Sequence, residues 1–294
     1  MMRAGIDLGG TKIELVLLDE RDRMVYRERL ATPQGQYDAT VEAMVALVHD
    51  AEKATGPIAS LGVGIPGAIS KQTGRIKNAN SICLIDQDLS GDLSAKLNRP
   101  VTLANDANCF ALSEAKDGAG KDADSVFGVI IGTGCGGGLV VDGKIVNGVN
   151  SIAGEWGHNP LPWLERDEKT FPCYCGLTGC TETFLSGSGF EQHYLWRTGQ
   201  KLSAQEIVAK VDQDSQAEQL LADYAIWLAK GLASVINIFD PDVIVLGGGM
   251  SNIDSLYEIV PSIWHQWVFS DRVDTKLLPP KWGDSSGVRG AAWL

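Results

Sequence analysis

The chain has 294 residues, 44% of them hydrophobic, which is enough for a sizeable core or for two domains of about 150 residues each. Its net charge of -12 argues against a nucleic-acid-binding surface, and no basic run or basic amphipathic helix indicates a membrane surface. The N-terminus lacks the apolar core of a signal peptide, and the apolar stretch 224–239 is too short to span a bilayer and contains Lys230. We therefore expect a cytoplasmic protein that binds neither nucleic acid nor membranes.

The beginning of the chain predicts three β-strands. Apolar runs at 3–9, 13–18 and 24–30 are rich in β-forming residues. The first two runs are joined by a turn made of Gly9, Gly10, Thr11 and Lys12. Such a turn can offer backbone N–H groups to a phosphate, and Asp7, just before it, could hold Mg²⁺ through water. Taken alone, the motif also fits a plain hairpin with a charged turn.

Helical and extended patterns alternate over the next part of the chain. Apolar residues at helical spacing predict a helix over 38–55, and a short strand is predicted at 61–65. Residues 70–92 are polar and irregular in pattern. This stretch offers hydrogen-bonding side chains for a polar ligand, those of Asn78, Asn80 and Ser81.

Asp106 is the candidate general base. It follows a predicted strand at 101–104 and precedes a predicted helix at 109–115, so it would lie at the carboxyl edge of a sheet. A carboxylate in that position can reach a substrate hydroxyl. Capping of the helix is the alternative role, which Asp and Asn both favour.

The opening pattern recurs in the second half of the chain. An apolar strand at 126–131 leads into a glycine-rich turn at 132–138, which contains Thr133 and Gly134, and a second apolar run follows at 139–141. The repeat predicts two related halves, each aiming a glycine turn at one cleft. We expect α/β domains at 1–117 and 118–294, with the last helix of the chain completing the first domain.

The glycines at 132, 134 and 137 match G-x-G-x-x-G, but they do not indicate a dinucleotide-binding fold. That motif needs a helix after the glycines, whereas a strand and the hairpin dipeptide Asp142-Gly143 follow here. The phosphate-binding pattern G-x-x-x-x-G-K-[ST] does not occur in the sequence either.

Helical patterns dominate the C-terminal part. Long helices are predicted at 216–239 and near 254–267, with a buried strand at 242–246 between them. The strand runs into glycines that include Gly248 and Gly249. Backbone without side chains can lie flat against a planar group such as adenine, although a tight strand–helix connection is an equal alternative.

One histidine and three cysteines lie within 23 residues, at His158, Cys173, Cys175 and Cys180. Thiolates and an imidazole suit a tetrahedral zinc ion with four protein ligands and a structural role. The spacing C-x-C-x4-C is not the common one, so ordinary thiols and a hydrogen-bonded loop histidine are the alternative. A disulfide is a poor explanation, because the other three cysteines are scattered.

Six motifs occur in an order typical of one family. They are D-L-G-G-T-K at 7–12, G-I-P-G at 64–67, N-D-A-N at 105–108, G-T-G at 132–134, G-E-W-G-H at 154–158 and C-x-C-G-x-x-G-C-x-E at 173–182. The chain resembles, from residue 5 to its end, the ROK family of bacterial sugar kinases and repressors. The combination is specific, although each motif alone is not.

The resemblance implies an actin-like, ribonuclease H-like α/β fold, in which two domains flank a cleft and close over ATP and a hexose. It implies an ATP-dependent hexose kinase that uses Mg²⁺ with ATP. The residues expected around the phosphates are Gly9, Gly10, Thr11, Thr133 and Gly134. Asp7 and Lys12 belong to the same ATP-binding motif, and Gly248 and Gly249 should line the adenosine side.

The remaining site residues are also carried over from the family. Asp106 should take the proton from the sugar hydroxyl. The side chains expected to bind the sugar, or to position groups that do, are Asn105, Glu155, His158 and Glu182. The expected ligands of a structural zinc are His158, Cys173, Cys175 and Cys180.

The segment 154–163 and the tail look most like bacterial fructokinases, also called manno(fructo)kinases, so fructose is the favoured substrate and fructose 6-phosphate the expected product. Glucose, mannose and N-acetylglucosamine are the alternatives. A repressor would carry a helix-turn-helix ahead of Asp7, where only six residues stand, and a sugar sensor without activity is a second rival. Family members are often dimers, so we expect a homodimer.

Overall fold

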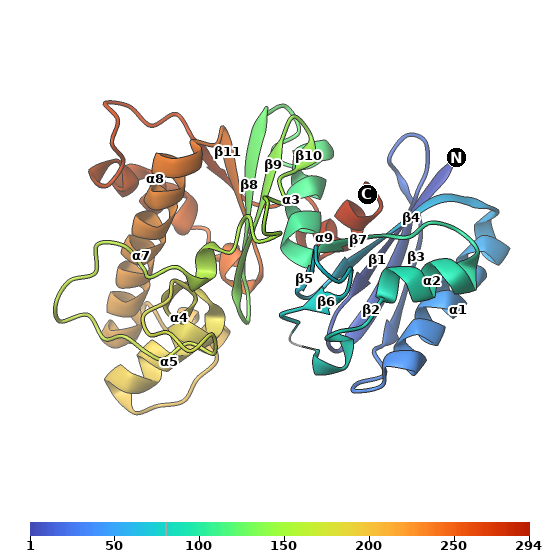
Figure 1. Ribbon diagram of the computed structural model, residues 1–294. Helices are drawn as coiled ribbons and strands as arrows, with labels where there is room; N and C mark the ends of the chain where they lie inside the picture. The colour runs from blue at the N-terminus through green and yellow to red at the C-terminus, as the bar shows by residue number, and fades with distance from the viewer. Residues whose placement is uncertain (80) are drawn as a thin grey trace. The chain divides into compact units, whose positions relative to one another are not determined.

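The computed structural model describes residues 1–79 and 81–294, with the side chain of Asp284 left out. The chain forms two compact units (Figure 1). The first unit contains Met1–Asp122, Gly138–Ala153 and Lys281–Leu294, and the second contains Ala123–Gly137 and Gly154–Pro280. The units interleave along the chain, and the continuous domain boundary after residue 117 stays a prediction.

The first sheet has five strands in the order β3, β2, β1, β4, β7 (Figure 1). These strands span Met24–Ala31, Lys12–Leu18, Met2–Leu8, Ile58–Ile65 and Thr102–Asn105, respectively. β1 is antiparallel to β2 and parallel to β4, which is parallel to β7. The strands predicted in this part of the chain are confirmed. The carboxyl ends of β1, β4 and β7 therefore lie at one edge of the sheet.

Two helices complete the core on this sheet. α1 (Tyr37–Thr55) packs against β2 and β3, and α2 (Leu89–Leu97) packs against α1. Their apolar residues and those of the strands form one buried cluster. The prediction of an irregular stretch at 70–92 is wrong where α2 begins, although Leu89, Leu93 and Leu97 have helical spacing.

Short elements connect these parts. A two-stranded hairpin, β5 (Ala68–Ile69) with β6 (Ile76–Lys77), is followed by the 3₁₀ turn η1 (Ile82–Leu84). α3 (Asp106–Lys116) begins three residues earlier than predicted and packs against the last helix, α9 (Ser286–Ala291), which follows η5 (Gly283–Ser285).

The second sheet has the order β10, β9, β8, β11, β12. These strands span Lys144–Ile145, Cys135–Val141, Ser125–Ile131, Val243–Gly247 and Lys276–Leu278, respectively. β11 is parallel to both β8 and β12, and the hairpin of β9 and β10 forms at the predicted Asp-Gly turn. The glycine turn is shorter than the sequence indicated, because β9 already begins at Cys135.

Helices and turns make up the rest of the second unit. They are η2 (Trp156–His158), α4 (Glu182–Leu185), α5 (Gly187–Thr198), α6 (Ala204–Val208), α7 (Ser215–Phe239), η3 (Gly249–Asn252), α8 (Leu256–Ile263) and η4 (Trp264–Gln266). The long helix predicted at 216–239 is confirmed as α7. The helix predicted near 254–267 is divided between α8 and η4.

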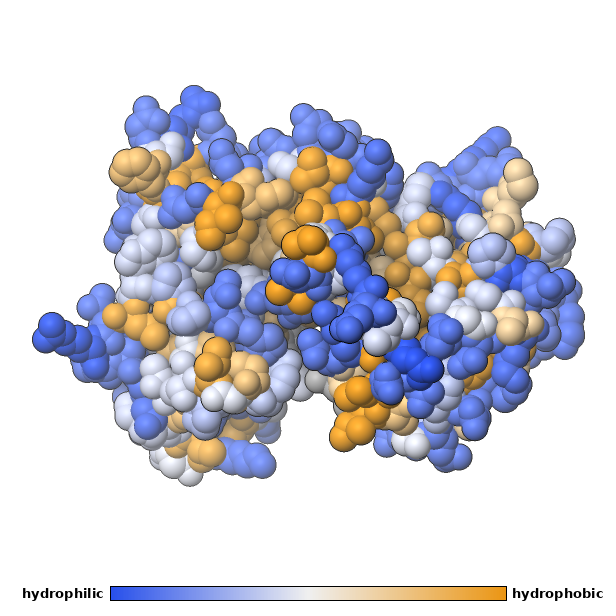
Figure 2. Space-filling view, in the orientation of Figure 1, coloured by the Kyte–Doolittle hydropathy of each residue, from blue (hydrophilic) through white to orange (hydrophobic). Residues whose placement is uncertain are grey.

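α7 is long and apolar enough to cross a membrane by length and composition alone, but 61% of its most apolar window is buried inside the structure. Lys230 in its middle is 4% exposed, with Nζ 3.8 Å from Glu168 and 3.9 Å from Glu165. Figure 2 shows hydrophilic residues over much of the visible face, with hydrophobic residues in separate patches. The burial of α7 and of its Lys230 is typical of a core helix of a folded protein.

Candidate functional site

The first glycine turn joins β1 to β2. The N–H of Gly9 donates to the carbonyl of Lys12 at 2.9 Å, and Thr32 Oγ1 donates to the carbonyl of Gly9 at 2.7 Å. Gly10 and Thr11 are exposed at the tip of the turn. An exposed tip of this kind is where a phosphate can meet backbone N–H groups.

Asp7 and Asp106 lie at the same sheet edge and act on each other electrostatically. Asp7 is the second-last residue of β1, and Asp106 is exposed at the start of α3, directly after β7. The pKa of Asp7 is raised from 3.8 to about 6, first by its removal from solvent and then by the negative charge of Asp106, against the opposing charge of Lys12. Because a divalent cation would offset this repulsion, the pair suits a Mg²⁺ ion bound with ATP.

Asn105 caps α3. Its Oδ1 accepts from the backbone N–H groups of Ala107 and Asn108, at 2.9 and 3.4 Å, and its Nδ2 donates to the carbonyl of Gly67 at 2.9 Å. Capping was the alternative role considered for Asp106. Asn105 is the N-cap residue, and Asp106 Oδ1 also accepts from the N–H of Ala107, at 2.8 Å. Asn105 therefore fixes the direction in which the strand end and the helix start present Asp106.

The predicted metal-binding residues come together. The ligand atoms of His158, Cys173, Cys175 and Cys180 all lie within 4.8 Å of one another. The Sγ atom of Cys173 is 3.6 Å from His158 Nδ1, and the Sγ atoms of Cys175 and Cys180 are 3.6 Å apart. In a tetrahedron with Zn–S bonds of 2.3 Å, the ligand atoms stand about 3.8 Å apart. The cluster therefore has the dimensions of a four-ligand zinc site.

The pKa values of these thiols reflect the crowding of several ionisable sulfur atoms, which a bound cation would relieve. Burial first, and then hydrogen bonds with the neighbouring thiols, raises the pKa of Cys180 to about 12, while the N–H of Leu177 lowers the pKa of Cys175. Packed thiols cannot all ionise without a compensating charge. A metal ion bound by these residues would supply that charge and would deprotonate the coordinating thiols.

His158 is the last residue of η2, and Glu155 is the residue directly before this turn. Glu155 is exposed. His158 directs Nδ1 toward the thiols and places Nε2 2.9 Å from the hydroxyl of Tyr174. The second ring nitrogen thus has a polar partner, a typical arrangement around histidines that bind metals.

Glu182 connects the cysteine loop to the second glycine turn. Its Oε2 accepts from the backbone N–H of Cys135 at 2.9 Å, and its Oε1 is 3.9 Å from Cys173 Sγ. The indole N–H of Trp156 also donates to the carbonyl of Gly136, at 3.1 Å. The segments around the metal-binding residues therefore hold the start of β9 in place.

The second and third glycine segments meet within the second unit. Gly248 has φ 83° and ψ 175°, a region that is essentially restricted to glycine. A Cβ atom at this position would lie 2.6 Å from the backbone of Ile131, so no larger residue fits. The ends of β8 and β11 can therefore approach each other closely.

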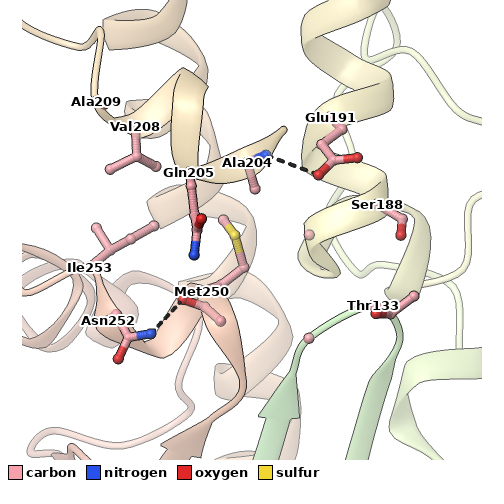
Figure 3. A pocket seen from close by; sticks show the side chains of 13 residues that line it. Thr133, Ser188, Glu191, Ala204, Gln205, Val208, Ala209, Met250, Asn252 and Ile253 are labelled. Carbon is pink, nitrogen blue, oxygen red and sulfur yellow. Dashed lines mark hydrogen bonds between the residues drawn. The ribbon is translucent and has the colours of Figure 1, made fainter. Parts of the chain in front are cut away.

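A pocket of about 540 Å³ opens beside these segments (Figure 3). Its lining comes from the second glycine turn, α5, α6 and η3 of the second unit. The residues are Gly132, Thr133, Gly187, Ser188, Glu191, Ala204, Gln205, Val208, Ala209, Gly249, Met250, Asn252 and Ile253. The volume is in the range of pockets that hold small ligands.

The predicted site residues fall into two groups, one in each unit. The first unit holds Asp7, Gly9, Gly10, Thr11, Lys12, Asn105 and Asp106. The second unit holds Thr133, Gly134, Glu155, His158, Cys173, Cys175, Cys180, Glu182, Gly248 and Gly249. Thr133 and Gly249 line the pocket, whereas the pocket residues of α5 and α6 were missed, since they have ordinary helical sequence. Of the polar side chains noted at 78–81, Asn80 lies outside the described residues.

The sequence has full-length relatives. The ROK family model matches residues 3–294. An N-acetyl-D-glucosamine kinase from Photobacterium profundum is 41% identical over 299 residues, covering 100% of this chain and 99% of the relative. An N-acetyl-D-glucosamine kinase from Vibrio cholerae is 42% identical, with the same coverage.

Solved structures show the same fold. A ROK hexokinase from Thermus thermophilus aligns with a TM-score of 0.88 and 30% identity, over 99% of this chain and 97% of that one. A ROK family glucokinase from Streptomyces griseus, in complex with glucose and AMPPNP, aligns with a TM-score of 0.81 and 26% identity, over 99% and 98%. The expected actin-like α/β sugar kinase fold is confirmed. The chain belongs to the ROK family.

Proposed function

We propose that this chain is an ATP-dependent N-acetylglucosamine kinase. The observation that supports the substrate is the end-to-end similarity, at 41% identity, to a relative named N-acetyl-D-glucosamine kinase. The sequence alone favoured fructose, from the likeness of one short segment and the tail. Similarity over the whole chain outweighs that likeness, so N-acetylglucosamine replaces fructose as the proposed acceptor.

Asp106 is the proposed general base. It is exposed at the start of α3, and Asn105 fixes the backbone around it. A carboxylate so placed can accept the proton of a sugar hydroxyl as that oxygen attacks the γ-phosphorus of ATP. The products are ADP and the sugar phosphate.

The glycine turns are the proposed phosphate-binding elements. Gly9, Gly10 and Thr11 offer an exposed turn in the first unit, and Thr133 and Gly134 offer one in the second. The pocket beside Thr133 and Gly249 is the proposed adenosine site. Mg²⁺, when bound with ATP near Asp7, would neutralise phosphate charge.

The cluster of His158, Cys173, Cys175 and Cys180 is proposed to hold a structural zinc ion. A site with four protein ligands leaves no position for a reacting water, which separates it from catalytic zinc sites. Its role would be to order the loop from which Glu155, His158 and Glu182 are proposed to contact the sugar.

ADP release from MgATP in the presence of N-acetylglucosamine, glucose, mannose or fructose tests this function. The highest kcat/KM should belong to N-acetylglucosamine. A preference for fructose would restore the earlier hypothesis. No turnover with any of these sugars would favour the alternative of a sugar sensor without catalytic activity. A homodimer and a cytoplasmic location remain predictions.

A further inference from the structure

Glu191 is the one charged side chain among the described residues that line the pocket of the second unit (Figure 3). Like charges repel strongly at short range where water is partly excluded. A carboxylate in a nucleotide pocket is therefore unsuited to lie against the phosphates. If this pocket holds ATP, as proposed, Glu191 is suited to contact a part of the nucleotide other than its phosphates.

The position of Glu191 on α5 indicates which part. The end of the pocket that is proposed to hold the phosphates contains Thr133 and Ser188. Beside it, the backbone N–H of Gly187 donates a hydrogen bond to the carbonyl of Gly132 at 2.7 Å. Glu191 lies three residues after Ser188, which is about 4.5 Å further along the helix axis. The group next to the phosphates of a nucleotide is its ribose, so this spacing brings Glu191 to the ribose.

The rest of the pocket suits a base. Val208, Met250 and Ile253 contribute apolar surface, and in Figure 3 the amide of Gln205 points toward Met250 and Asn252. Mostly apolar walls with a few polar groups are typical of sites for planar ligands. Glu191 lies above Ser188 on α5 in this view, and its carboxylate reaches the start of α6 (Figure 3).

A hydrogen bond to the backbone holds the carboxylate of Glu191 in place and leaves it able to accept further hydrogen bonds. Its Oε1 accepts from the N–H of Ala204 at 2.9 Å (Figure 3). The start of α6 already has a capping box made by Ser203 and Glu206, so the helix does not depend on Glu191 for its cap. A carboxylate offers about four acceptor positions, and ribose hydroxyls are donors.

We propose that Glu191 accepts hydrogen bonds from the ribose hydroxyls of the nucleotide, and that it makes this protein select ribonucleotides over deoxyribonucleotides. The inference rests on the proposed function, in which this pocket holds ATP. It names a specificity-determining residue that takes no part in the transfer of the phosphoryl group.

Calorimetric binding of Mg²⁺ complexes of ADP, 2′-deoxyADP and 3′-deoxyADP tests the proposal without turnover. The wild type should bind ADP about ten- to hundredfold more tightly than at least one deoxy analogue, as expected for a hydrogen bond to a charged group. Glu191→Ala should reduce this ratio to within about threefold, because it weakens the binding of ADP, which has both hydroxyls, more than the binding of the deoxy analogues. Glu206→Ala, which removes the capping box of α6, should keep the wild-type ratio.

Equal binding of all three nucleotides by the wild type would overturn the proposal. A uniform loss of affinity in Glu191→Ala would also overturn it, since that result marks a scaffold residue. If the alanine variant does not fold, Glu191→Gln decides, because it keeps the size of the side chain and an acceptor for Ala204; an unchanged ratio there refutes the proposal. Selective ADP binding by a protein that phosphorylates no sugar would support the role of Glu191 while refuting the proposed function, and absence of ADP binding would refute both.

Discussion

Glu182 Oε2 accepts a hydrogen bond from the backbone N–H of Cys135 across 2.9 Å. Glu182 stands two residues after the last cysteine of the proposed metal-binding cluster, and Cys135 is the first residue of β9 after the second glycine turn. A Cβ atom on Gly134 would lie 2.9 Å from the same oxygen. One carboxylate thus connects the cluster to the turn proposed to hold phosphate.

Loss of the metal should therefore reduce activity as well as stability. Purified protein should contain about one zinc ion per chain, and Cys175→Ser should lose most of it, because three ligands bind zinc far more weakly than four. We expect kcat/KM to fall at least about tenfold, as when groups supporting a metal site are removed. Metal analysis and steady-state kinetics measure both effects.

Cys83→Ser is the matched control, since Cys83 is a thiol in η1, outside the cluster. It should keep the zinc content of the wild type. Wild-type protein purified without chelator and found free of zinc would contradict the metal assignment.

Asp106→Asn should lower kcat by at least about a hundredfold, because the amide cannot accept the hydroxyl proton. Removing one of the two neighbouring negative charges should leave the fold intact, which thermal unfolding checks. Asp38→Asn, at an exposed carboxylate in the first turn of α1, serves as the control and should retain full turnover. Near-normal turnover in Asp106→Asn would show that another group is the base.

Gly248→Ala and Gly249→Ala should fail in different ways. At Gly248 the backbone angles and the approach of Ile131 exclude a side chain, so alanine should lower the free energy of unfolding by about 1–3 kcal/mol. At Gly249 a Cβ atom would meet no atom of the described residues within 4 Å, but it would occupy the pocket. That variant should unfold like the wild type and raise the KM for ATP about tenfold. Urea unfolding and ATP kinetics on both variants separate the two effects, and equal destabilisation would argue against them.

His193 should make the protein less stable in acid. It is buried between Phe171, Phe184 and Trp227, and burial first, followed by the charge of Arg197, lowers its pKa from 6.5 to about 4. The unfolded chain binds a proton below its pKa of 6.5, while the folded protein does not until about pH 4. Stability due to neutral His193 is thus complete above pH 6.5 and falls as the pH drops toward 4, by about 3 kcal/mol in total.

His193→Phe should remove this part of the pH dependence. The phenyl ring suits the aromatic surroundings, although it gives up the hydrogen bond to the backbone of Thr183. The free energy of unfolding, measured by urea denaturation from about pH 7 to about pH 4, should therefore fall less in the variant than in the wild type. The same decline in both proteins would mean that other groups control the acid transition.

Much of the fold could be predicted from the sequence, because apolar periodicity marks a buried strand or helix face directly. Strands β1, β2 and β3 and helix α7 follow such patterns almost to the residue. α2 was missed because polar residues surround its three leucines, which are spaced four apart. The start of β9 was predicted too late, because its glycines suggested a turn where the chain is already extended.

Of the candidate site, the histidine and cysteine cluster could be predicted from the sequence, whereas the pocket could not. The proposed metal ligands are close in sequence and chemically distinctive, so the sequence predicted a cluster that the structure brings together. The pocket depends on packing among α5, α6 and η3, which no local pattern specifies. The sequence pattern around Glu191 therefore does not distinguish it from other polar residues of a helix, and only the packing of α5 against α6 places it in a pocket.

The most direct test of the central claim is the transfer of labelled γ-phosphate from ATP to N-acetylglucosamine, with fructose as a parallel acceptor. We expect one labelled sugar phosphate per ADP formed, and a higher kcat/KM for N-acetylglucosamine than for fructose. Label that appears only in inorganic phosphate, or mainly in a fructose phosphate, would contradict the assignment.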